Sequence, residues 1–321
     1  MTDRRSLLAA TMSLAASLLA GRAAHAEQAF ASLRMFIPAG PGGGWDGLGR
    51  AIELVLRQAG KVGSFQFENV GGAGGAVGLP RFIARRGQGD TLMVGGAVMV
   101  GATLTNRSPV GLKDTTPIAR LTEEAGVIVV PAASPIRTIG QFMEALKANP
   151  GAISVGGGSA GGTDHIALGL MLKALGRSAR EASYVAYAGG GPAQAAILGA
   201  QVAAGISGLS EFSEQIKAGR MRALATTGAS RTDPDIPTLK ESGFDVVAAN
   251  WRGVFGAPAI TAGQRDALIA LMTGMHALPA WKELLATRGW EDAFLTGDPF
   301  VKFIAEDTAA TEVVLKELGL A

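Results

Sequence analysis

Residues 33–56 read LRMFIPAGPGGGWDGLGRAIELVL: an apolar segment, a turn of proline and glycine, and an amphipathic segment. The apolar run at 33–37 has the length and composition of a buried strand. Beyond the turn, Leu48, Ile52 and Val55 recur at the spacing of one helix face. This stretch therefore predicts a strand, a loop and a helix in succession, the unit from which helix-covered parallel sheets are built.

The same alternation recurs along most of the chain and predicts an α/β fold. Beyond residue 257 the pattern predicts only helices, at 262–275, 281–287 and 299–318. Further strands are predicted at 65–70, 92–94, 127–130, 153–155, 184–185, 202–206, 221–226 and 246–257.

The order of these segments predicts two lobes, because the chain leaves one sheet, builds a second and returns. We expect lobe one to contain residues 27–125 and 251–321, and lobe two residues 126–250. Each lobe would be a mostly parallel sheet flanked by helices. The two crossing segments would form a hinge.

The first 26 residues have the layout of a cleaved signal peptide. Arg4 and Arg5 precede an uncharged run at 6–20, and Ala24-His25-Ala26 is a small-x-small cleavage site. The run is too short to span a bilayer, which takes about 20 residues. We therefore expect an exported mature chain that begins near Glu27. The arginine pair also leaves a twin-arginine signal open beside the general secretory route.

Charge and composition argue against several classes of function. Removing residues 1–26 takes three arginines and one aspartate from the 29 basic and 27 acidic residues, so 26 of each remain. No basic run marks a nucleic-acid surface. Cysteine is absent, and only His165 and His276 remain after cleavage. We expect no metal site, no cofactor and a monomer.

Three glycine-rich loops, at 40–44, 156–162 and 189–191, each join a predicted strand to a predicted helix. Such a loop points several backbone N–H groups in one direction, and the helix dipole behind them favours an anion. Because one loop belongs to lobe one and two belong to lobe two, they can hold a small carboxylate from both sides of a cleft. Each loop can also be no more than a tight turn.

A dinucleotide site is a first alternative. Residues 42–47, GGGWDG, match G-x-G-x-x-G, and Glu68 lies at the expected distance. Trp45, however, would stand where a pyrophosphate must approach the backbone closely.

An exported serine hydrolase is a second alternative. Residues 157–161, GGSAG, match the nucleophile elbow around Ser159. His165 follows this serine too closely to be the usual base, and His276 lies within an apolar helix face. We therefore expect that the protein is not an enzyme.

Several polar residues have two interpretations at this point. Asp46 begins a predicted helix, where it can cap the helix or line the cleft. Asp164 and His165 begin the helix after the second loop and can reach ligand or solvent. Arg252, beside Trp251 on the returning strand, can bind a ligand carboxylate or form a structural ion pair.

Four segments of the chain form a recognisable set: PAGPGGGWD at 38–46, NVGGAGG at 69–75, GSAGGTDH at 158–165 and YAGGGPA at 187–193. Together they resemble the substrate-binding receptors of tripartite tricarboxylate transporters, the Bug-type periplasmic proteins. The resemblance covers essentially the whole mature chain, and the first and third segments look like the tricarboxylate-receptor branch.

The resemblance implies a two-lobed type II (Venus-flytrap) periplasmic binding fold that closes on a carboxylate and presents it to membrane permease subunits. A citrate-like tricarboxylate or a dicarboxylate is favoured, and a ligand sensor for a signalling partner remains open. The ligand-binding residues expected are Gly40, Pro41, Gly42, Gly43, Gly44, Trp45, Asp46, Gly95, Gly96, Ala97, Ser159, Ala160, Gly161, Gly162, Thr163, His165, Gly190, Gly191 and Trp251.

One position departs from the family pattern. Many relatives carry an acidic residue in the helix that follows the Gly-Pro-Ala segment, where this chain has Gln194. Ligands with an amino group that needs such a partner are therefore disfavoured by the resemblance.

Overall fold

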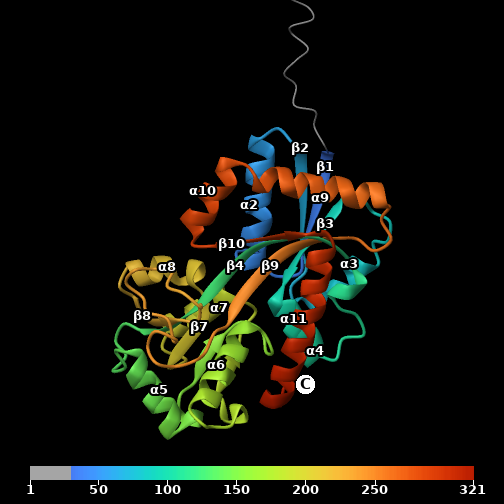
Figure 1. Ribbon diagram of the computed structural model, residues 1–321. Helices are drawn as coiled ribbons and strands as arrows, with labels where there is room; N and C mark the ends of the chain where they lie inside the picture. The colour runs from blue at the N-terminus through green and yellow to red at the C-terminus, as the bar shows by residue number, and fades with distance from the viewer. Residues whose placement is uncertain (1–29) are drawn as a thin grey trace, which may run out of the picture.

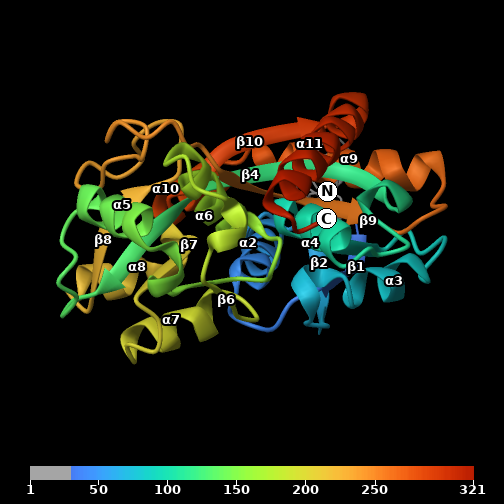
Figure 2. The same cartoon turned by 90° about the horizontal axis from the view of Figure 1, so that it is seen from below.

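The computed structural model describes residues 30–321, so the predicted signal peptide at 1–26 lies outside the described residues. The helices and strands gather into two groups, and the long strands β4 and β9 run between them (Figure 1). Seen from below, α5, α7 and α8 lie toward one end of the molecule and α3 and α9 toward the other (Figure 2).

Within residues 30–321, ten strands form one sheet in the order β2-β1-β3-β9-β4-β7-β5-β6, with β8 and β10 also paired to β4. The strands are β1 (Phe30–Ile37), β2 (Val62–Asn69), β3 (Thr91–Gly96), β4 (Thr116–Pro131), β5 (Val155–Gly157), β6 (Tyr184–Ala186), β7 (Ala204–Gly208), β8 (Met221–Thr226), β9 (Ala249–Gly256) and β10 (Glu291–Thr296).

The sheet is mixed. β1 is parallel to β2 and β3, and β5 is parallel to β6 and β7. The crossing strands β4 and β9 are antiparallel to each other and to their other neighbours. Parallel pairing therefore belongs to the outer part of each group, as the strand–loop–helix alternation predicted, and antiparallel pairing belongs to the crossing.

Ten helices cover the sheet in the described part of the chain, in addition to short 3-10 turns. They are α2 (Gly44–Gln58), α3 (Gly78–Ile83), α4 (Ala97–Thr105), α5 (Ile139–Ala148), α6 (Thr163–Ala174), α7 (Gly190–Leu198), α8 (Leu209–Lys217), α9 (Ala262–His276), α10 (Pro279–Arg288) and α11 (Gly297–Leu318).

Separate hydrophobic cores define the two lobes. One core draws on residues 33–121 and 251–304, and we call the elements around it lobe one. Two smaller clusters draw on residues 127–246, and we call the elements around them lobe two. β4 belongs to both, because Leu121 is buried in the first core and Ile128 in the second.

The predicted two-lobed α/β fold is therefore confirmed. β4 and β9 pair from Thr116 opposite Gly256 to Ala125 opposite Ala249, so two adjacent strands make the crossing. The lobe boundaries predicted at 125 and 250 fall within these strands, and their position as the hinge stays a prediction.

Two elements differ from the sequence prediction. β10 lies in a region predicted to be purely helical. Its sequence EDAFLT is half-exposed, and antiparallel pairing to the edge of β4 makes it a strand. α4 was not predicted, because AVMVGATLT contains four β-branched residues, which favour strands, and a glycine, which weakens a helix. Its buried residues, among them Met99 and Val100, pack into the first core.

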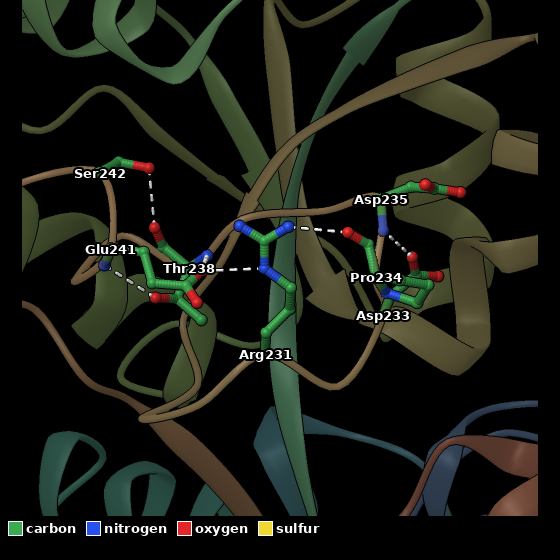
Figure 3. A network of polar contacts seen from close by, with 7 residues as sticks. All are labelled: Arg231, Asp233, Pro234, Asp235, Thr238, Glu241 and Ser242. Carbon is green, nitrogen blue, oxygen red and sulfur yellow. Dashed lines mark hydrogen bonds and ion pairs between the residues drawn. The ribbon is translucent and has the colours of Figure 1, made fainter.

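A network of polar contacts organises the long connection between β8 and β9, which contains neither helix nor strand (Figure 3). Arg231 donates to the Glu241 carboxylate over 3.1 Å and to the Pro234 carbonyl over 2.7 Å. The Thr238 N–H donates to the same carboxylate, and with Arg231 it holds the pKa of Glu241 below its usual range. The connection is thus fixed by hydrogen bonds where it has no ladder of its own.

Besides the crossing strands β4 and β9, the helix α11 also connects the two lobes, because it belongs to lobe one and its end contacts lobe two. Its first half packs Phe300 and Ile304 into the first core. Its last turn brings Leu318 against Gly169 of α6, where Lys173 also pairs with Glu317. Within residues 30–321, none of the helices has both the length and the apolar character needed to cross a membrane.

Candidate functional site

A cavity of about 670 Å³ lies between the lobes. Its wall comes from both lobes, mostly from loops that precede helices. Lobe one contributes Pro38, Ala39, Gly40, Pro41, Gly42, Gly43, Gly44, Trp45, Gly72, Ala73, Gly74, Gly75, Val98 and Asn106. Lobe two contributes Gly158, Ser159, Ala160, Gly162, Thr163, Asp164, Ala186, Tyr187, Ala188, Gly189, Gly190, Gly191, Pro192, Ser207, Gly208 and Glu211, and the crossing strand β9 contributes Asn250 and Arg252.

Four helices of the described residues 30–321 begin at this cavity: α2 from lobe one, and α6, α7 and α8 from lobe two. The start of α8 already donates its Ser210 N–H to Glu124, so α2, α6 and α7 are the starts considered for a ligand. Their N-cap residues Gly43, Gly162 and Gly189 all line the wall. The first backbone N–H groups of a helix have no partner within it, and the helix dipole makes that end electropositive. Three such ends at one cavity form a binding site for an anion that needs no lysine.

Most of the predicted site residues line this cavity. The first loop contributes all of its predicted residues except Asp46, and the loops before α6 and α7 contribute most of theirs. The residues concerned are Gly40, Pro41, Gly42, Gly43, Gly44, Trp45, Ser159, Ala160, Gly162, Thr163, Gly190 and Gly191. The structure therefore brings together loops that lie about 150 residues apart in sequence.

Asp46 does not line the cavity but supports the first loop from behind. Its carboxylate accepts hydrogen bonds from the Gly42 N–H and the Asn69 side chain, each over 3.1 Å. Asn69 also donates to the Ala39 carbonyl over 3.2 Å. Asp46 is thus engaged by its own loop and orients the loop for whatever binds in front of it.

Gly161 and His165, also predicted to bind ligand, support the loop before α6. His165 Nδ1 accepts a hydrogen bond from the Gly161 N–H over 3.3 Å, and its ring stacks on Tyr184 with centroids 4.2 Å apart. Burial lowers the pKa of His165 to about 4, so the ring is neutral near pH 7. Gly161 has φ +74° and faces Thr105 of α4 instead of the cavity.

The remaining predicted residues belong to the interior of lobe one. Trp251 is 3% exposed, donates from Nε1 to Asp307 over 3.1 Å, and packs edge-on against Phe300 and Phe303. Gly96 lies against the backbone of Trp251, so no cleft reaches it, and Gly95 and Ala97 also stand outside the wall. The structure therefore places these four predicted residues outside the wall of the cavity.

Arg252 is the one basic residue in the wall among residues 30–321, and it is already paired. Its Nη1 lies 2.6 Å from a Glu124 carboxylate oxygen, and both side chains are almost fully buried. The other Glu124 oxygen accepts from the Ser210 N–H over 2.7 Å. The guanidinium also lies against Gly44 at the start of α2. The ion pair therefore joins the crossing strands to the cavity.

Two acidic side chains also line the cavity. Burial raises the pKa of Asp164 to about 7, the Gly158 N–H at 2.8 Å lowers it, and nearby Glu211 raises it. Tyr184, which donates to the Gly158 carbonyl, has a pKa well above its usual value because it is buried and lies near Asp164. Asp164 therefore changes charge near neutral pH.

Affinity for an anionic ligand is expected to fall about three- to tenfold between pH 6 and pH 8, because Asp164 gains its negative charge in that interval. The free energy of unfolding should also fall as the pH rises from about 4 to about 7. In that interval Asp164 is still protonated in the folded state but has lost its proton in the unfolded state. Calorimetric titration with an acid fully ionised above pH 6 measures the first effect.

In Asp164→Asn, which keeps an oxygen for the Gly158 N–H, both trends should flatten. The exposed Asp266→Asn is the matched control and should keep the wild-type profile. An unchanged slope in Asp164→Asn would assign the pH dependence to another group.

Neither enzymatic alternative finds support at the cavity. Within residues 30–321 no hydrogen bond joins Ser159 to a histidine: His165 faces Gly161, and His276 pairs with Asp292 over 2.9 Å. Glu68, the acid of the dinucleotide pattern, pairs with Arg85 over 2.6 Å and is not part of the wall.

The prediction missed several wall residues. The sequence did point to some of them: Gly72–Gly75 belong to the family-like segment NVGGAGG, and Asp164 and Arg252 each had ligand contact as one of two interpretations. Nothing in the sequence pointed to Ser207 and Glu211, because a strand end followed by LSEFSEQ reads as an ordinary exposed helix start.

Comparison with known proteins agrees with this fold and cavity. A family model described as "Tripartite tricarboxylate transporter family receptor" matches residues 60–320. The chain belongs to this family. Protein BugT of Bordetella pertussis is 27% identical over 300 residues, which are 89% of each chain. The family consists of periplasmic solute-binding receptors, not enzymes.

Solved structures show the same fold in these receptors. The periplasmic binding protein BugD superposes with a TM-score of 0.81 at 23% identity, covering 90% of this chain and 98% of BugD. An R. palustris protein solved with adipate superposes with a TM-score of 0.81 at 22% identity, covering 90% of this chain and 97% of that protein.

Proposed function

We propose that this family member is an exported, monomeric receptor that captures a small carboxylate by closing its lobes. It then delivers the ligand to the membrane permease of a tripartite tricarboxylate transporter. The signal-like residues 1–26 support export to the periplasm. Family membership supports the permease as partner.

The observation that carries the proposal is the meeting of three helix starts from both lobes at one cavity. A carboxylate placed there would accept backbone hydrogen bonds from α6, from α7 and from the first-turn N–H groups of α2 other than that of Gly44, which already donates to Glu211. Because these donors sit on different lobes, the anion stabilises the closed arrangement more than an open one. Such differential affinity is what drives closure on a ligand.

The charges in the wall favour a ligand with few carboxylate groups over a ligand with many. One guanidinium, already paired, stands against Glu211 and, as the pH rises past the Asp164 pKa of about 7, also against Asp164. Two like charges about 5 Å apart repel by about 3 kcal/mol at an effective dielectric constant of 20. A citrate-like tricarboxylate, which the sequence favoured together with dicarboxylates, therefore fits the wall less well than a ligand with one or two carboxylates.

A thermal-shift panel tests the proposal on refolded mature protein that begins at Glu27. The panel contains mono-, di- and tricarboxylates, with neutral sugars as controls. A ligand at a hundredfold its dissociation constant adds about 2.7 kcal/mol to the free energy of unfolding. We expect stabilisation by one class of carboxylate and none by sugars. Stabilisation by sugars alone, or by nothing in the panel, would overturn the proposal.

A further inference from the structure

Glu211 places a fixed carboxylate across the cavity. It lies in the first turn of α8 in lobe two, and its Oε1 accepts a hydrogen bond from the Gly44 N–H of lobe one over 3.0 Å. Its Oε2 accepts from the Ser207 hydroxyl. A Cβ at Gly190 would lie 2.5 Å from the same oxygen, so the carboxylate rests directly on the start of α7. Contacts on three sides hold the group in place.

No unpaired basic side chain in the described wall faces this carboxylate. Arg252 is the only basic lining residue in the described chain, and its charge is matched by Glu124 at 2.6 Å. Asp164 is a second lining acid. The wall therefore offers backbone N–H donors for one ligand carboxylate, and side-chain acceptors with negative charge for the remainder of the ligand.

We propose that Glu211 is the selectivity residue of the site: it accepts a hydrogen bond from a hydroxyl or ammonium group of the ligand and repels a second ligand carboxylate. This inference rests on the proposed function and narrows it. The substrate class is a small monocarboxylate that also carries a hydroxyl or ammonium group, so that its net charge is −1 or zero.

The assignment reverses an expectation from the sequence. Amino-bearing ligands were disfavoured because Gln194, in α7, stands where many relatives have an acid. Glu211 supplies an acid to the same cavity from α8 instead. Its distance along the chain from the glycine loops explains why the sequence motifs did not point to it.

The test is a calorimetric titration of wild type and Glu211→Gln with acids of equal chain length. The first set is succinate, γ-aminobutyrate, γ-hydroxybutyrate and butyrate, and the second is glutarate, δ-aminovalerate, δ-hydroxyvalerate and valerate. Wild type should bind the amino or hydroxy acid at least about tenfold more tightly than the dicarboxylate of that length. In Glu211→Gln this preference of the ammonium acid over the dicarboxylate should fall at least about tenfold.

Glutamine keeps an oxygen for the Gly44 N–H, and the preference is a ratio within one protein, so partial loss of folded protein cancels. Glu214→Gln, an exposed substitution on the same helix, is the matched control and should leave the ratio within threefold. A wild-type preference for the dicarboxylates, or a Glu211→Gln ratio within threefold of wild type, would overturn the inference while leaving the receptor function intact. Failure of every carboxylate, including those of the thermal-shift panel, would overturn both.

Discussion

Gly101→Ala is expected to weaken carboxylate binding at least about tenfold without lowering the stability of the unliganded protein. Gly101 lies inside α4 of lobe one, and a Cβ at this position would stand 2.0 Å from the Gly161 carbonyl oxygen of lobe two. The lobes must separate to admit the methyl group, so the closed arrangement becomes rare. Apparent affinity falls by the fraction of molecules that can still close.

The stability of lobe one should rise in the same variant, because alanine is better than glycine inside a helix by about 0.5–1 kcal/mol. Gly274→Ala in α9 is the matched control, since a Cβ there meets nothing within 4 Å. It should gain the same helix stability and bind ligand as wild type does. Calorimetry with the best carboxylate measures both affinities. Equal binding by Gly101→Ala and Gly274→Ala would show that capture does not require this approach of the lobes.

Arg252→Met is expected to lower the free energy of unfolding by about 3–5 kcal/mol, because it leaves the Glu124 carboxylate buried without its counter-charge. Arg252 and Glu124 are 2% and 1% exposed. A buried ion pair often adds little net stability over a well-packed apolar pair, whereas removing one partner alone is costly. Urea unfolding followed by circular dichroism gives the difference directly.

The double variant Arg252→Met with Glu124→Gln should recover at least about half of that loss, since no buried charge remains. The exposed Arg265→Met is the control and should stay within about 0.5 kcal/mol of wild type. If Arg252→Met costs less than about 1 kcal/mol, the pair is solvated and the charge balance drawn for the cavity does not hold.

Features encoded by short, local patterns could be predicted from the sequence. A glycine run between an apolar segment and an amphipathic segment indicates where a helix begins. The cavity is lined by such helix starts, so most of its wall could be located from the sequence. The two-lobed path followed from the order of strands alone. β10 and α4 could not be predicted in this way, because pairing with β4 and packing into the first core decide their conformation.

The direction of individual side chains needed the structure. Trp251 and Arg252 are neighbours on β9, and successive side chains of a strand point to opposite faces. Trp251 therefore enters the core of lobe one while Arg252 reaches the cavity. Neighbouring side chains on a helix point about 100° apart. Asp164 therefore lines the cavity, whereas His165 packs against Gly161 and Tyr184. Glu211 reaches the site through contacts that only the fold supplies: with Ser207 and Gly190 in lobe two and with Gly44 across the cavity.

The most direct measurement of the central claim repeats the carboxylate panel by calorimetry on refolded protein, with each acid beside its primary amide. The amide keeps the size and shape of the ligand and removes only the anion that the starts of α2, α6 and α7 are proposed to hold. We expect the best acid to bind with one-to-one stoichiometry and its amide at least about a hundredfold more weakly. Acid and amide binding equally well would contradict the account, because the cavity would then recognise shape without recognising a carboxylate.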